Sequence, residues 1–299
     1  MKAPISAVAA ALLAASAASA APDPLTAPIA HSHAAEWLGP QTPLRIWGNS
    51  YYVGTAGLSV GLIKTPAGLI LIDASMPQGA AAIEAHIRQL GFKLTDVKYI
   101  LITEPHFDHS GGAAALARDT GAVVVASAPT AKALRAGQVG PDDPQSGLLA
   151  PFPTVVRVRE IGDGEAVSLG GVAVTARLTP GHTAGSTSWT WTSCEAGKCQ
   201  NLVFAASLNP VSADGFRFTG TPLPDTFRRS GQRIAALPCD ILISAHPDNS
   251  GMDAKLKALK AGAKPNPFVD PGACRAYAVR AASLLDARLA KEQATASAR

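Results

Sequence analysis

The sequence predicts one α/β domain in which two β-sheets pack face to face and helices cover their outer faces. Short apolar runs rich in β-branched residues, bounded by Gly, Pro and Asn, alternate with segments of helical spacing, in two successive blocks. Each strand must bury at least one face and each helix one stripe, so layers of sheet and helix are the compact solution. The chain has 299 residues, of which 47% are hydrophobic, and this is enough for such a core. We find no linker between the two halves.

The N-terminus is typical of a secretory signal peptide. Lys2 supplies a positive charge, residues 8–15 form an apolar run, and Ala18-Ser19-Ala20 is a small-residue cleavage site. The run is too short to span a bilayer, and no other stretch predicts a transmembrane helix. We expect cleavage after residue 20 and export to the periplasm, with residues 21–42 as an arm on the body and residues 43–299 as the domain.

Turn signals and helical spacing define the elements of the first block. They are a meander of strands over residues 45–73, a helix over 80–90 that ends at Gly91, a buried strand over 99–103, a helix over 113–119, a strand over 122–126 and a helix over 129–136. Residues 138–153 are rich in Gly and Pro, and we expect them to form a loop over the site.

The second block has the same order of strands followed by helices. Its expected elements are three strands within residues 155–178 with a hairpin turn at Gly170-Gly171, strands over 186–192, 202–206 and 240–244, and helices over 224–237, 252–261 and 271–291. The last helix is predicted to be strongly amphipathic.

Residues 99–112, YILITEPHFDHSGG, place four potential metal ligands directly after a buried strand. Glu104, His106, Asp108 and His109 lie within six residues, and imidazole and carboxylate groups are ligands that Zn²⁺ prefers. Ser110 is a candidate cap for the following helix. The alternative, a polar surface loop with two histidines, is disfavoured because the run is dense and follows a buried strand.

Two further histidines are the first polar side chains after the ends of predicted strands. His182 follows the strand over residues 172–178, and His246 follows the strand over 240–244. Alone, each is more typical of an ordinary turn. Together with His106 and His109 they indicate a shared metal centre.

The order Glu104-x-His106-x-Asp108-His109 resembles the HxHxDH signature of the metallo-β-lactamase superfamily, with Glu in place of the first His. Residues 181–191, 205–209 and 244–248 continue the resemblance, and residues 45–77 are similar to the opening hairpins of subclass B3. The similarity spans roughly residues 37 to 282. It implies the four-layer αββα sandwich with two mixed sheets flanked by helices.

The resemblance implies two zinc ions and β-lactam hydrolysis, with hydroxide at the metals as the nucleophile. The first zinc is expected on Glu104, His106 and His182, and the second on Asp108, His109 and His246. Asp108 is also expected to orient the nucleophile as the catalytic residue. Ser207 and Asn209 occupy positions that contact the substrate carboxylate, although a polar turn at a strand end explains Asn209 equally well.

Glu104 is the main departure from the family pattern. A carboxylate makes the first site one charge less positive than three neutral histidines would, so its bound water is acidified less. We therefore expect the first site to hold zinc more weakly than the second.

Four cysteines fit an oxidising compartment. Cys194 and Cys199 flank a turn between two strand patterns, where a disulfide would join a hairpin. Three pairings of four cysteines exist in principle. The resemblance supports the pair Cys239–Cys274.

Other functions remain open at this level. A net charge of +4 without a basic cluster does not indicate nucleic acid as a partner, and we expect a monomer that binds a small β-lactam and no membrane. The alternatives are another secreted hydrolase of the same fold, such as a lactonase or esterase, and a degenerate periplasmic metal-binding protein that has lost catalysis.

Overall fold

The computed structural model describes residues 21–297, so the predicted signal peptide lies outside the described residues. A first sheet contains β1 (Leu44–Trp47), β2 (Ser50–Tyr52), β3 (Gly61–Thr65), β4 (Gly68–Ile72), β5 (Val97–Leu101), β6 (Val123–Ala126) and β7 (Val158–Glu160). A second sheet contains β8 (Ala166–Leu169), β9 (Val172–Leu178), β10 (Thr187–Glu195), β11 (Lys198–Ala205) and β12 (Ile241–Ser244). The helices are α1 (Ala34–Trp37), α2 (Ala80–Gln89), α3 (Phe107–Ser110), α4 (Ala113–Thr120), α5 (Ala128–Ala136), α6 (Leu223–Ala236), α7 (Met252–Lys260) and α8 (Ala273–Ser297).

Both sheets are mixed. The first has the order β1-β2-β3-β4-β5-β6-β7, antiparallel up to β4 and parallel from β4 to β7. The second has the order β12-β11-β10-β9-β8, and only β11 and β12 pair in parallel. Parallel neighbours require crossover connections, which the helices supply.

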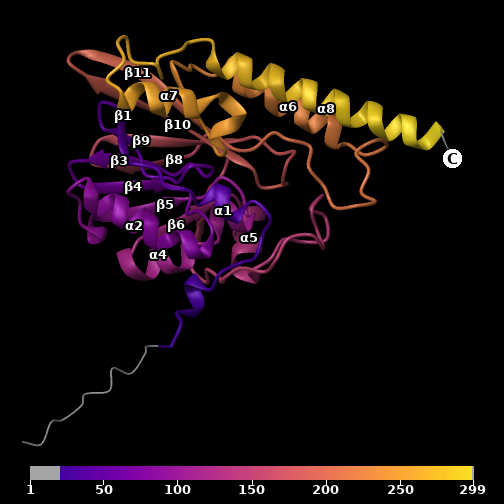
Figure 1. Ribbon diagram of the computed structural model, residues 1–299, viewed down its shortest axis with the longest axis horizontal. Coiled ribbons are helices and arrows are strands. Elements are labelled where there is room, and N and C mark those ends of the chain that lie inside the picture. Colours follow the sequence, from indigo (N-terminus) through magenta and orange to yellow (C-terminus); the bar gives the residue numbers. More distant parts are fainter. Residues whose placement is uncertain (1–20, 298–299) are drawn as a thin grey trace, which may run out of the picture.

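Three apolar cores separate four layers. Figure 1 shows α2, α4 and α5 on the outer side of the first sheet and α6, α7 and α8 on the side of the second. Strand β4 illustrates the arrangement, because Leu69 and Leu71 pack toward the helices whereas Ile70 and Ile72 pack between the sheets. A third core lies between the second sheet and the helices α6 and α8. The predicted αββα sandwich is therefore confirmed.

The hairpin of β10 and β11 extends further than the sequence predicts. Cys194 and Cys199 lie within the two strands as direct partners, with a Cα–Cα distance of 4.0 Å, and form a disulfide. The connecting residues Ala196 and Gly197 have φ values of 48° and 77°. Such positive values fit the tight turns that match the twist of a hairpin.

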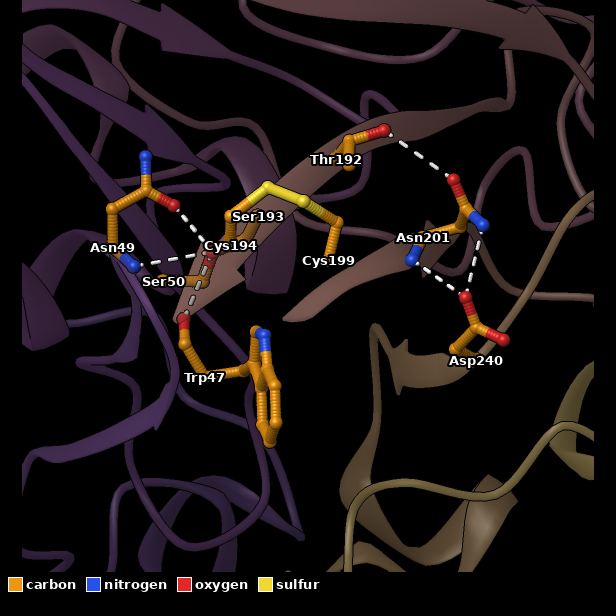
Figure 2. Close-up of a disulfide and its surroundings, with 9 residues drawn as sticks. All are labelled: Trp47, Asn49, Ser50, Thr192, Ser193, Cys194, Cys199, Asn201 and Asp240. Atoms are coloured by element: carbon orange, nitrogen blue, oxygen red, sulfur yellow. Dashed lines mark hydrogen bonds between the residues drawn. A yellow bond between two sulfur atoms is a disulfide. The ribbon is translucent and has the colours of Figure 1, made fainter. Parts of the chain in front are cut away.

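Side-chain hydrogen bonds hold the strands of this hairpin to their surroundings (Figure 2). Ser193 donates to the backbone carbonyl of Trp47 at 3.0 Å and to the side chain of Asn49. On the other strand, the backbone amide of Asn201 donates to Asp240 at 2.8 Å. The hairpin is thereby fixed both to the first sheet and to the start of β12.

The second disulfide joins Cys239, just before β12, to Cys274 in the first turn of α8. The two residues are 35 positions apart, with a Cα–Cα distance of 6.2 Å. This bond fixes α8 against the second sheet.

Two local predictions were wrong. Ser110 does not cap α4, because it belongs to the single turn α3 and its hydroxyl donates to the carbonyls of Pro105 and His106, each at 3.0 Å. The helix α8 is not strongly amphipathic along its length, since Val279 is 66% exposed whereas Glu292 is only 7% exposed. Within residues 21–297, no helix has both the length and the apolar character needed to cross a membrane.

Candidate metal centre

The predicted ligands meet at the edge where strands of both sheets end. Glu104 follows β5, His182 follows β9, Ser207 follows β11 and His246 follows β12. The turn α3 begins directly after His106 and carries Asp108 and His109. All these side chains are buried except that of His246, which is 13% exposed.

Asp108, His109 and His246 form one group whose donor atoms lie within 4.8 Å of one another. Nε2 of His109 lies 3.1 Å from Nε2 of His246. The carboxylate oxygen Oδ2 of Asp108 lies 3.3 Å from the first of these nitrogens and 3.2 Å from the second. Two imidazole nitrogens and one carboxylate oxygen thus point at a common centre.

His106 and His182 form a second pair, with 3.1 Å between Nδ1 of His106 and Nε2 of His182. The side-chain amide of Gln145 lies beside both nitrogens, at 3.4 and 3.5 Å. The family resemblance predicts that Glu104 belongs with this pair. In the structure, Oε1 of Glu104 lies 3.0 Å from Nε2 of His109, so this carboxylate also faces the other group.

Each histidine uses its other ring nitrogen to contact an acceptor outside the centre. The contacts are His106 Nε2 to Asp143 Oδ2 at 3.1 Å, His182 Nδ1 to the Asn209 carbonyl at 2.8 Å, His246 Nδ1 to the Gly57 carbonyl at 3.1 Å, and His109 Nδ1 to Asp73 Oδ2 at 3.5 Å. A carbonyl oxygen only accepts, so the outer nitrogens of His182 and His246 carry the proton. In their neutral form these two rings direct a lone pair inward, which is the arrangement that a bound metal cation uses. The residues present therefore fit a bound metal.

The charge of the centre supports the same conclusion. The side chains of Asp73, Glu104 and Asp108 are at most 8% exposed, and within residues 21–297 their ion-pair partners are histidines, not Lys or Arg. Burial lowers the pKa of His109, but Asp108 and Glu104 raise it well above its ordinary value. Burial opposes the charge of Asp108, yet His109 and His246 hold its pKa well below the usual range. A divalent cation would compensate the same negative charge.

Serine hydroxyls position the Glu104 carboxylate. Ser207 donates to Oε1 at 2.6 Å and Ser186 donates to Oε2 at 3.4 Å. Burial raises the pKa of Glu104, but the charges of His109, His182 and His106 and the Ser207 hydrogen bond lower it below its ordinary value. The carboxylate is therefore held ionised with fixed orientation.

Sequence reasoning missed several residues of this centre. Asp73 precedes α2, and Asp143 and Gln145 lie in the predicted loop over residues 138–153. The acidic pair in PDDPQ was the available signal. Trp37 was not predicted either, and its ring centroid lies 5.3 Å from that of His246.

A known family profile matches part of the chain. The family is described as the metallo-β-lactamase superfamily, and residues 54–195 match it.

Solved structures of B3 and related metallo-β-lactamases cover nearly the whole chain. One, described as the first B3 metallo-β-lactamase with an active-site glutamic acid, is 51% identical with a TM-score of 0.84, covering 91% of this chain and 99% of that one. Rm3 metallo-β-lactamase is 45% identical with a TM-score of 0.86, at 89% and 100% coverage. SMB-1 bound to 2-mercaptoethanesulfonate is 47% identical with a TM-score of 0.83, at 86% and 99% coverage.

Curated relatives are more distant. The hydroxyacylglutathione hydrolase of Brucella anthropi is 29% identical over 182 residues, which are 61% of this chain and 58% of that protein. The hydroxyacylglutathione hydrolase of Rhodopseudomonas palustris (strain BisB5) is 27% identical, at 67% and 71% coverage. This chain thus spans less than two thirds of the first of these relatives.

Proposed function

The chain belongs to the metallo-β-lactamase superfamily, and on this premise we propose that it hydrolyses the amide bond of β-lactams with zinc bound at the buried centre. The observation that carries the proposal is the convergence of imidazole nitrogens and carboxylate oxygens on one centre, where the outer ring nitrogens of His106, His182 and His246 are already hydrogen-bonded. The identity of 41–51% to solved B3 and related enzymes supports the substrate class.

We assign the metal ligands to two sites. Glu104, His106 and His182 would hold the first zinc, and Asp108, His109 and His246 the second. Zinc at these sites would act as a Lewis acid on the carbonyl and would lower the pKa of bound water toward neutrality.

The residues of the chain position the reacting groups. The Oδ2 atom of Asp108 lies between His109 and His246. Burial raises the pKa of Asp108, but these two histidines hold it well below the usual range. The carboxylate therefore stays ionised and can accept a hydrogen bond that orients a water molecule. Ser207 already donates to Glu104, and its role is to fix this carboxylate. The side chain of Asn209 remains a candidate donor to the substrate carboxylate, because the contact with His182 uses the backbone carbonyl of Asn209 and not its side-chain amide.

Glu104 gives the first site a lower positive charge than three histidines would. We propose that zinc is retained there more weakly than at the second site. The orientation of Glu104 toward both groups supports a role as ligand, since its carboxylate lies 3.0 Å from Nε2 of His109.

We further propose that the protein is exported and acts in the periplasm as a monomer. The disulfides Cys194–Cys199 and Cys239–Cys274 support an oxidising compartment.

A second candidate is thioester hydrolysis, which the relatives named hydroxyacylglutathione hydrolase favour. Their lower identity and shorter coverage make β-lactam hydrolysis the better-supported function.

Turnover of nitrocefin by the purified mature chain tests the proposal, with S-lactoylglutathione as the competing substrate. We expect nitrocefin hydrolysis that a chelator abolishes and added zinc restores. His246→Ala is the control for the metal centre. Hydrolysis of the thioester alone would establish the second candidate, and activity that survives the chelator would contradict the zinc mechanism.

A further inference from the structure

The segment over residues 206–222, between β11 and α6, contains no helix or strand. Irregular segments of this length are uncommon inside a compact domain and usually have a functional reason. We call this segment the site loop because it begins at the metal centre. Ser207 donates to Glu104 at 2.6 Å, and the carbonyl of Asn209 accepts from His182 at 2.8 Å.

The site loop also supports the opposite loop over residues 138–153. The amide of Ala213 donates to the carbonyl of Pro144 at 2.8 Å. The residue before Pro144 is Asp143, whose carboxylate contacts His106 at 3.1 Å. The position of the site loop therefore bears on both histidines of the first site.

The far side of the site loop is held by Arg288 on α8. Its guanidinium donates to the hydroxyl of Ser212 at 2.8 Å, to the carbonyl of Phe216 at 2.9 Å and to the carbonyl of Pro210 at 3.4 Å. It also lies over the ring of Phe218, 4.9 Å from the centroid. One side chain thus contacts four positions along the loop.

Glu292, one helical turn further along α8, holds the end of the same loop. Its carboxylate accepts from the amide of Phe218 at 3.0 Å and from the amide and hydroxyl of Thr219 at 2.9 and 2.8 Å. It also accepts from Nε of Arg288 at 2.7 Å. Its backbone carbonyl accepts from the side chain of Arg217 at 2.9 Å.

Burial shows that this pair is more than a surface contact. The side chains of Arg288 and Glu292 are 24% and 7% exposed, and a buried charge is tolerated only where it is paired and hydrogen-bonded. Burial raises the pKa of Glu292, but the amides of Phe218 and Thr219 outweigh this and lower it to about 2. The loop backbone thus stabilises the ionised form of the Glu292 carboxylate.

Arg288 and Glu292 both lie on α8, which supplies no proposed metal ligand. Figure 1 shows α8 running along α6 and extending beyond the sheets toward its C-terminal end. Neither residue is in contact with a proposed metal ligand. Their effect on the centre must therefore pass through the loop.

We propose that Arg288 and Glu292 are positioning residues, which hold the site loop so that Asn209 and the Pro144 segment keep the first-site histidines in place. The proposal rests on the proposed function only where turnover is measured. The second readout of the proposal, the order of the site loop, does not depend on turnover.

Glu292→Gln is the test variant, because it keeps the shape of the side chain and removes its charge. Asp286→Asn is the matched control on the same helix, since Asp286 is 60% exposed and pairs at 2.8 Å with Arg228, outside the loop. Trypsin cleavage between Arg217 and Phe218, followed by mass spectrometry on the zinc-loaded proteins, reports opening of the loop. Nitrocefin kinetics report KM and kcat separately.

We expect cleavage at Arg217 to become faster by about tenfold or more in Glu292→Gln, since a hydrogen-bond network to a charged group is lost locally. KM should rise severalfold with a smaller change in kcat, and Asp286→Asn should match the parent in both. Parent-like cleavage and KM in Glu292→Gln, or the same changes in Asp286→Asn, would overturn the proposal.

Arg288→Lys provides a second test if Glu292→Gln does not fold. Lysine keeps the positive charge beside Glu292 but lacks the planar fork that reaches Ser212 and Phe216. Faster cleavage at Arg217 is again expected, and a parent-like rate would contradict the proposal. If no variant and no parent turns over nitrocefin, the proposed function fails, while the cleavage comparison still decides the role of the pair.

Discussion

Protonation of Glu292 is expected to remove about 3 kcal/mol from the free energy of unfolding. The ordinary pKa of 4.5 falls to about 2 in the folded chain because the loop amides outweigh the effect of burial. One pKa unit corresponds to about 1.4 kcal/mol, and a side chain that is 7% exposed is little screened by solvent.

The sign follows from the direction of the shift. The folded state favours the ionised form, so the stabilisation is fully present above the unfolded pKa of 4.5. It is lost as the pH falls toward about 2, with about half gone midway between the two values. At neutral pH, Glu292→Gln should lower Tm by roughly 6–12 °C, given about 2–4 °C per kcal/mol for a chain of this size.

Urea unfolding followed by circular dichroism, in the parent and in Glu292→Gln from about pH 6 to about pH 3, measures this effect. The amide mimics the protonated acid, so the difference in unfolding free energy should shrink as the pH falls. Loss of metal and protonation of other carboxylates affect both proteins and largely cancel in the difference. A difference in unfolding free energy that stays constant across this pH range would refute the inference that the charge of Glu292 stabilises the folded state.

Further predictions concern the metal centre and the second disulfide. Asp108→Asn should lose the second metal and lower kcat/KM by several orders of magnitude, measured with nitrocefin and by elemental analysis. Asp143→Asn should weaken first-site zinc by about 10- to 100-fold in a competition titration, because the histidine it orients loses its carboxylate partner. Glu104→His should retain more zinc than the parent after dialysis at matched pH, whereas equal zinc content would make Glu104 a bystander. Replacing Cys239 and Cys274 by Ser should lower the unfolding free energy by about 4 kcal/mol in the chain-entropy model, and an unchanged urea midpoint would contradict this.

The sequence alone determined the features that depend on neighbouring residues. The strand β5 followed by Glu104, His106, Asp108 and His109 is a local pattern, because an apolar β-branched run and a dense group of donors need no distant partner to be seen. The hairpin disulfide Cys194–Cys199 is local in the same sense, although the strands are longer than their apolar runs indicated.

Tertiary structure decided which distant segments complete the site. Asp143 reaches His106 across 37 positions, and Ser207 reaches Glu104 across 103. Neither contact leaves a periodic pattern in the sequence, because each depends on how irregular loops lie beside the two packed sheets. The sequence therefore indicated Ser207 only through family resemblance and did not indicate Asp143.

The burial of Glu292 shows the same limit most clearly. Helical spacing predicted an amphipathic α8, and a charged residue near its end is ordinarily exposed. Glu292 is nevertheless buried, because the backbone amides of Phe218 and Thr219, more than 70 positions away, donate hydrogen bonds to its carboxylate. The sequence predicted a helix over residues 271–291, but only the tertiary structure decided that Glu292 on this helix binds the site loop, because a buried carboxylate is stable only where donors such as the loop amides meet it.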